Sequence, residues 1–218
     1  MSDTAGAASG AAAGGDDVLQ DVPTERPVLR HDVLHHGLVW DVVSDVVDLG
    51  DSQVVREYVD HTGAVAVIAL DEDDRVLLLS QYRHPVRAVL WEPPAGLLDV
   101  EGEDPAAAAA RELAEEADLR AGAWWRLVEL NTTPGGSTER IVVFLARDLS
   151  PVPDEHRFSR EDEEAAMVPR WVPLDEAVEA VLDGRLHSPT TVTGVLAAAT
   201  ARSLGWSTLV PVEVPGEA

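Results

Sequence analysis

The sequence predicts a layered α/β domain, α+β in some classification schemes, built on a mixed sheet. Apolar, β-rich stretches alternate with helical segments along most of the chain, which is the pattern of such layered domains. The chain has 218 residues, of which 45% are hydrophobic, so it can bury a sizeable core. No internal repeat interrupts this pattern, so a single main domain is expected.

The N-terminal part of the chain divides into a tail and a strand-rich unit. Residues 1–20 are mostly small and polar, as in a flexible tail. Two β-rich stretches, 38–49 and 53–60, flank a Gly-Asp-Ser turn, which predicts a hairpin. The expected organisation of the whole chain is a tail at 1–20, a strand unit at 21–62, the main domain at 63–205 and a C-terminal tail at 206–218.

The main domain contains four predicted strands and three predicted helices. The strands at 64–70 and 75–83 are joined by an acidic turn and are apolar enough to be buried on both faces. The helix that follows has Asp104 as its N-cap and Pro105 at its first position, where each residue type is favoured. The remaining predicted elements are strands at 124–132 and 140–149, a helix at 175–184 that ends at Gly184, and a last helix at 190–205.

The composition excludes several classes of function. The net charge of −24 argues against binding to a nucleic-acid backbone or to an anionic membrane surface. All 16 basic residues are Arg, which excludes Schiff-base and P-loop lysines, and the absence of Cys excludes thiol catalysis and thiolate-bound zinc. No apolar run has the length of a membrane span and no signal peptide is visible, so a cytoplasmic protein is expected.

The helix that begins at Pro105 carries an unusual group of carboxylates. Glu115 and Glu116 are adjacent, and Glu112 precedes them by three and four residues. Like charges at the latter two spacings destabilise a helix by a few tenths of a kcal/mol each. A solvated surface is one explanation. The other is a site for a hard divalent cation, because carboxylate and carbonyl oxygens are the ligands that Mg²⁺ prefers. Arg111 is placed to pair with one of these carboxylates and fix its orientation.

The spacing of these residues resembles the Nudix hydrolases. Their box runs Gly, five residues, Glu, seven residues, then Arg-Glu-apolar-any-Glu-Glu-any-Gly-apolar. This chain departs from it twice: six residues follow the first glycine, and Asp118 replaces the last one. The matching residues are Gly96, Glu103, Arg111, Glu112, Leu113, Glu115, Glu116 and Leu119.

The resemblance extends to the ADP-ribose pyrophosphatase branch over roughly residues 30–205. The stretches REYVDHTGAV (56–65) and QYRHPVRAVLWEPPAG (81–96) are similar to that branch, and PGGSTE (134–139) follows the box at the expected distance. The resemblance implies an α/β/α sandwich that uses two or three Mg²⁺ ions, or Mn²⁺, to hydrolyse ADP-ribose to AMP and ribose 5-phosphate. It also implies a homodimer with swapped N-terminal strands, matching residues 36–60.

Two alternatives remain open at the level of sequence. One is hydrolysis of other nucleoside diphosphate sugars, since details of the pocket decide that choice. The other is a sensor with the same fold that binds ADP-ribose without cleaving it, since fold does not fix function. Sensors usually lose box carboxylates or add a DNA-binding unit, and neither change is visible here.

The resemblance also assigns roles to individual residues. It implies that metal is held by the carbonyl of Ala95 and by Glu112, Glu115 and Glu116, with Glu115 also a catalytic candidate. The general base is expected in a loop after the last long strand, as Glu163 or the adjacent Glu164. Trp40 is either an adenine-stacking residue or part of the core or of a dimer interface, and the core is favoured. Substrate-binding candidates are Arg56, Glu57, Arg83, Pro134, Gly135, Gly136 and Glu139, and the residues expected to orient the site are Gly96, Glu103 and Arg111.

Overall fold

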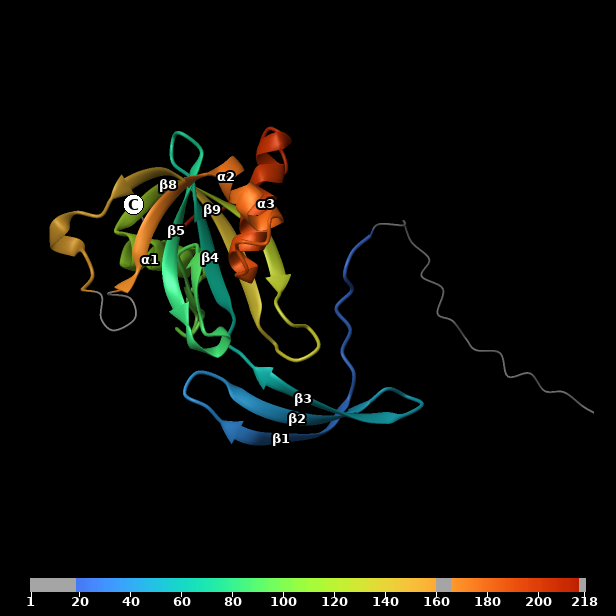
Figure 1. The fold of residues 1–218 in the computed structure, drawn as a ribbon. Coiled ribbons are helices and arrows are strands. Elements are labelled where there is room, and N and C mark those ends of the chain that lie inside the picture. Colours follow the sequence, from blue (N-terminus) through green and yellow to red (C-terminus); the bar gives the residue numbers. More distant parts are fainter. Residues whose placement is uncertain (1–18, 160–165, 216–218) are drawn as a thin grey trace, which may run out of the picture.

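The computed structural model describes residues 19–159 and 166–215, which form a sandwich with a small sheet attached (Figure 1). Three helices are found: α1 (Pro105–Ala117), α2 (Leu174–Leu182) and α3 (Pro189–Ser203). Two short 3-10 helices are η1 (His84–Val86) and η2 (Asp154–His156). The strands are β1 (Val28–His36), β2 (Asp41–Asp48), β3 (Gln53–Asp60), β4 (Ala64–Ala69), β5 (Arg75–Arg83), β6 (Ala88–Glu92), β7 (Ala95–Leu97), β8 (Leu119–Asn131), β9 (Arg140–Pro151), β10 (Val168–Pro173) and β11 (Val210–Pro211).

The main sheet is mixed, as the sequence predicts. Its strand order is β11-β8-β9-β4-β7, in which β4 runs parallel to β9 and the other neighbours are antiparallel. A second sheet, β10-β5-β6, is antiparallel throughout. The turn after β4 therefore leads the chain into a different sheet, so β4 and β5 do not form a hairpin.

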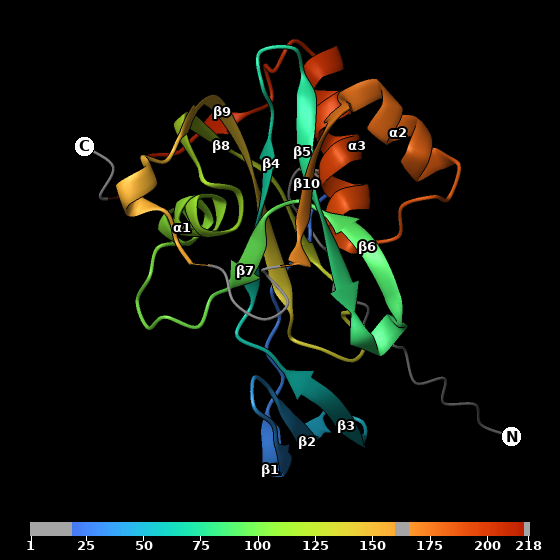
Figure 2. The same ribbon diagram turned by 60° about the vertical axis from the view of Figure 1, so that its left-hand side comes forward.

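Helices cover both faces of the main sheet (Figure 2). Alternate residues of β4 point to opposite faces: Val65 and Val67 pack in the cluster with α1, whereas Ala66 and Ile68 pack with α2 and α3. A Cβ atom at Gly194 of α3 would lie 2.6 Å from Ile68 Cδ1, so glycine allows this helix to approach the sheet. The result is the expected α/β/α sandwich.

Helix α1 begins as its sequence predicts. The Asp104 side chain accepts the Ala106 N–H at 2.8 Å, and Pro105 occupies the first turn. Asp118 ends the helix in the left-handed region at φ 54°, the conformation that glycine adopts most readily. Buried alanines, including Ala108 and Ala109, bring the helix close to the sheet.

The N-terminal sheet, β1-β2-β3, projects from the sandwich (Figure 1). The β2–β3 hairpin is confirmed, while β1 is an additional strand that the sequence analysis did not predict. Every residue of β1 is exposed. At the other end of this sheet, β3 is attached to the sandwich because the Val59 N–H donates to Gly136 O at 3.0 Å.

Residues 206–215, the described part of the stretch expected as a tail, contribute to the sheet. Strand β11 of this segment pairs with β8, and the Val212 N–H donates to Trp124 O at 3.0 Å. Val212 and Val214 also pack against the core beside α1. Within the described part of the chain, no helix is long and apolar enough to cross a membrane.

Candidate active site

Arg111 is the centre of the acidic cluster on α1. Its Nε and Nη2 donate to the two oxygens of Glu103 at 3.1 and 3.0 Å, a bidentate pairing. Its Nη1 contacts Glu112 Oε1 at 2.6 Å and Glu115 Oε2 at 3.3 Å. The hydrogen bond from Arg111 lowers the pKa of Glu103, so this carboxylate is held in its ionised form. The sequence analysis expected one partner for Arg111, and the structure gives it three.

Strand β7 lies against the same face of α1. The Ala95 N–H donates to Glu116 Oε2 at 2.9 Å, which fixes this buried carboxylate beside the strand. A Cβ atom at position 96 would lie 2.7 Å from Glu112 Cγ and closer still to its carboxyl group. Gly96 therefore gives Glu112 room against the backbone. The extra loop residue and Asp118 leave these contacts intact.

The chemistry of these groups suits a hard divalent cation. Glu112, Glu115, Glu116 and the Ala95 carbonyl supply only oxygen donors, which favours Mg²⁺ or Mn²⁺ over softer metals. In residues 19–159 and 166–215, no three acidic or histidine side chains converge as a ready metal site. The contacts between Arg111 and two of the glutamates explain this, because they turn those carboxylates toward the guanidinium.

A cavity of about 560 Å³ is lined by all three residues of β7. A hollow of about 1060 Å³ between α1 and the C-terminal strand is larger, but among the candidates that the structure describes it is lined by Arg111 alone. The smaller cavity is lined by Arg83, Ala95, Gly96 and Glu139 among the candidates, and also by Val39, Trp40, His61, Ala64, Val65, Glu92, Leu97, Thr132, Thr133, Ile141, Ser188, Pro189 and Thr190.

The walls of this cavity carry both signs of charge. Arg83 Nε donates to Glu92 Oε2 at 2.7 Å, and Glu92 is buried, so the guanidinium is oriented from β6. The Arg83 side chain remains 43% exposed, which leaves donors for an anionic ligand. The assignment of Trp40 to the core is wrong: the residue precedes β2, is 46% exposed and lines the cavity.

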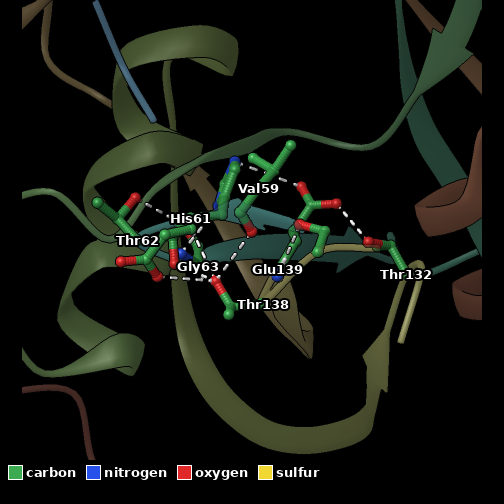
Figure 3. Close-up of polar contacts among 9 residues, drawn as sticks. Val59, His61, Thr62, Gly63, Thr132, Thr138 and Glu139 are labelled. Atoms are coloured by element: carbon green, nitrogen blue, oxygen red, sulfur yellow. Dashed lines mark hydrogen bonds and ion pairs between the residues drawn. The ribbon is translucent and has the colours of Figure 1, made fainter. Parts of the chain in front are cut away.

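Glu139 is held from two sides (Figure 3). The Thr132 hydroxyl donates to Glu139 Oε2, and His61 Nε2 lies 3.6 Å from Glu139 Oε1. Ser137 Oγ accepts the Glu139 N–H at 3.1 Å, which closes the loop beneath the carboxylate. This carboxylate is thus a fixed acceptor in the cavity wall.

Other candidates lie away from the cavity of this chain. Arg56 and Glu57 are exposed on β3, and neither lines the cavity. Pro134, Gly135 and Gly136 form a turn closed by the Gly136 N–H, which donates to Thr133 O at 2.9 Å. The turn is joined to β3 because the Val59 N–H donates to Gly136 O at 3.0 Å. Glu163 and Glu164 lie outside the described residues.

The residues that contact Arg83 and Glu139 in the cavity were not predicted: His61, Glu92 and Thr132. They lie in the β3–β4 connection, in β6 and directly after β8, and none has a partner at a recognisable spacing in the sequence. Glu92 and His61 do lie within the two stretches that resemble the ADP-ribose pyrophosphatase branch, which is the one signal that pointed to them.

Taken together, the sandwich, the acidic helix and the adjoining cavity define a hydrolase of the α/β/α type with an oxygen-donor site. The chain belongs to the NUDIX domain family, whose profile matches residues 60–191.

Known relatives agree with this assignment. The chain is 44% identical over 172 residues to an ADP-ribose pyrophosphatase of Mycobacterium tuberculosis (strain ATCC 25618 / H37Rv), covering 78% of this chain and 81% of the relative. It is 33% identical to an ADP-ribose pyrophosphatase of Bacillus subtilis (strain 168), covering 77% and 89%. A solved ADP compounds hydrolase superposes with a TM-score of 0.69 at 21% identity, covering 85% of this chain and 99% of that one, and supports the fold.

Proposed function

We propose that this protein is a metal-dependent hydrolase that cleaves the diphosphate of ADP-ribose to AMP and ribose 5-phosphate. One observation carries the proposal: residues of β7 both contact the carboxylates of α1 and line a cavity with room for part of a nucleotide sugar. The relative that is 44% identical and is named ADP-ribose pyrophosphatase supports the choice of substrate.

Divalent-metal dependence is typical of the family. Glu112, Glu115, Glu116 and the Ala95 carbonyl would hold two or three Mg²⁺ ions, or Mn²⁺. Such ions neutralise a diphosphate and lower the pKa of a bound water. Arg111 keeps Glu103 and Glu112 in place through the hydrogen bonds described above, and it separates negative charges that would otherwise repel one another.

The other residues bind and orient the substrate. Arg83 offers a planar donor to the diphosphate oxygens, and Trp40 offers an exposed ring on which adenine can stack. Glu139 accepts a hydrogen bond from a hydroxyl of the sugar, because an ionised carboxylate has only acceptor atoms. The general base, Glu163 or Glu164, takes a proton from the attacking water as a phosphorus–oxygen bond of the diphosphate breaks.

The N-terminal sheet is proposed to form a homodimer in which strands are exchanged between protomers. Large apolar side chains are exposed across it, including Val33, Leu34 and Val55, and such patches mark interaction surfaces. Arg56 and Glu57 would then reach the cavity of the partner. Light scattering on the purified protein is expected to give twice the mass of one chain, and a monomer at micromolar concentration would contradict the dimer.

The test of the reaction is release of AMP from ADP-ribose in the presence of Mg²⁺. We expect Glu116→Gln to lower kcat/KM by about a hundredfold or more, because a charged ligand is lost from the site. Glu179→Gln, on the exposed face of α2, is the matched control and is expected to leave the rate unchanged. Binding of ADP-ribose without turnover in Mg²⁺ and in Mn²⁺ would instead indicate a sensor. Absence of both would direct the assay to other nucleoside diphosphate sugars.

A further inference from the structure

We propose that His61 is a positioning residue for the sugar end of the cavity. It holds the carboxylate of Glu139 so that this group accepts a hydrogen bond from a ribose hydroxyl of the substrate. The inference rests on the proposed function and extends it to the recognition of the sugar. His61 lies in the connection between β3 and β4, lines the cavity, and has a side chain only 12% exposed.

A hydrogen bond from the backbone fixes which ring nitrogen of His61 faces Glu139. His61 Nδ1 accepts the N–H of Gly63 at 2.9 Å. A ring nitrogen that accepts a hydrogen bond carries no proton, so the neutral ring has its proton on Nε2. Nε2 is the atom that faces Glu139 Oε1, at 3.6 Å (Figure 3). The donor is therefore oriented toward the carboxylate before any ligand arrives.

The separation of 3.6 Å exceeds a direct hydrogen bond and lies within the range of an ion pair. Contacts of this kind are often long in a ligand-free protein and shorten when the substrate binds. The opposite oxygen of Glu139 already accepts from Thr132. Donors on both sides fix the orientation of the carboxylate. Its remaining lone pairs accept hydrogen bonds from a ligand in the cavity.

The charge of Glu139 indicates which part of the substrate it meets. A carboxylate repels a diphosphate but accepts hydrogen bonds from hydroxyl groups, so it belongs at the sugar. Arg83, whose donors suit phosphate oxygens, lines the same cavity. The ring of Trp40 lies 6.3 Å from that of His61 and so adjoins the same region.

A second hydrogen-bond set keeps His61 and the loop of Glu139 together. The His61 N–H donates to Thr138 Oγ1 at 2.7 Å, and the Thr138 N–H donates to Val59 O at 3.0 Å. These hydrogen bonds join the segment after β3 to the loop that carries Glu139, and Figure 3 shows the contacts of Thr138. His61 could serve this local structure alone, and the test must separate the two roles.

Two substitutions make that separation. Asn at position 61 can accept the Gly63 N–H through its side-chain oxygen, as in an Asx-turn, but it is too short to donate to Glu139. Gln places an amide N–H near the position of Nε2. We therefore expect His61→Asn to weaken the binding of ADP-ribose, measured by calorimetry, about tenfold, because one hydrogen bond to a charged group is lost. His61→Gln should retain most of the affinity, and both variants should unfold near the wild-type temperature.

The dependence on Glu139 is tested with a double-mutant cycle. Glu139→Gln should also weaken binding, and adding His61→Asn to it should cost little more, because the two residues act as a unit. In turnover, His61→Asn should raise KM with kcat within about twofold, as expected when binding is lost equally from ground and transition states. His156→Gln, at an exposed position in η2, is the control and should behave as wild type.

The outcomes distinguish this inference from the proposed function. Wild-type affinity in His61→Asn, or fully additive losses in the double variant, would overturn the role of His61 even if the enzyme is active. Wild-type protein that binds ADP-ribose without cleaving it, together with weakened binding in His61→Asn, would support His61 and contradict the hydrolase. Absence of ADP-ribose binding to the wild type would contradict both.

Discussion

The acidic cluster of α1 and the Asp45 site of the N-terminal sheet both contain hydrogen-bonded carboxylates, but their donors differ. On α1, Arg111 contacts Glu103, Glu112 and Glu115, so three carboxylates share one guanidinium, and Glu116 accepts the Ala95 N–H. In the N-terminal sheet a single carboxylate, Asp45, accepts from His31 Nδ1 at 2.7 Å and from the Tyr58 hydroxyl at 2.8 Å.

The two sites differ in how their carboxylates are stabilised. Hydrogen bonds from His31 and Tyr58 lower the pKa of Asp45, and its charge is compensated by the sheet itself. On α1, three carboxylates contact the same guanidinium, and a helix tolerates like charges at this spacing only at a cost. A divalent cation bound by these oxygen donors would offset that repulsion, which is why the cluster on α1 is the functional one in this account.

The largest effect that separates the two sites is expected from Arg111→Lys. Lysine keeps the charge but cannot make the bidentate pairing with Glu103 or reach three carboxylates at once. We expect kcat/KM for ADP-ribose to fall about 10- to 100-fold, the usual range for residues that orient metal ligands. Arg202→Lys on α3, which loses a pairing with Asp175, is the control for any Arg substitution. An equal loss in both variants would remove the special role of Arg111.

An alkaline titration tests the Asp45 site. The hydrogen bond to Asp45, together with burial, raises the pKa of Tyr58 to about 12. Because the folded state holds this proton more tightly than the unfolded state, stability from the pair is complete below about pH 10 and is lost as the pH rises toward 12. The chain has no Lys or Cys and only two Tyr, so few other groups titrate in this window.

The measurement is the ultraviolet absorbance of tyrosinate as a function of pH, alongside the unfolding temperature. Tyr58→Phe should remove the transition near pH 12 and flatten the alkaline loss of stability. If the wild type and this variant lose stability in parallel from pH 10 to 12, the hydrogen bond between Tyr58 and Asp45 is not what links stability to pH.

Sequence reasoning succeeded where the determinants are local. Strand β5 matches its predicted range of 75–83, and α1 begins at Pro105 as predicted, because turn and capping residues act within a few positions. It failed for β1, which has no buried face, and for β7 and β11, which are three and two residues long. Such strands form because a neighbouring strand is available, and their own residues carry little signal.

The same distinction applies to the site. The carboxylates of α1 lie on one helix, so their spacing in the sequence is their spacing in the structure. His61, Glu92 and Thr132 come together only through the pairing of distant strands, and nothing in their local sequence specifies that meeting. Trp40 was misjudged for a related reason: its exposure is set by the position of the N-terminal sheet relative to the cavity, not by its neighbours in sequence.

The smallest effect is expected at the end of α1. Asp118 adopts φ 54°, where glycine is favoured, so Asp118→Gly should raise the free energy of unfolding by up to about 1 kcal/mol. Chemical denaturation measures this change. The rate with ADP-ribose should be unaffected, because the substitution relaxes the helix end without changing its carboxylate cluster. A drop in rate would show that the backbone at Asp118 positions the site.

The most direct test of the account is calorimetric unfolding with and without Mg²⁺, in the wild type, in Asp45→Asn and in the double variant Glu112→Gln/Glu116→Gln. The account predicts that Mg²⁺ at a hundred times its Kd stabilises the wild type and Asp45→Asn by about 2–3 kcal/mol. It also predicts that the double variant loses this gain while being no less stable than the wild type in the absence of metal. An undiminished gain from Mg²⁺ in the double variant would contradict the assignment of the metal site to α1.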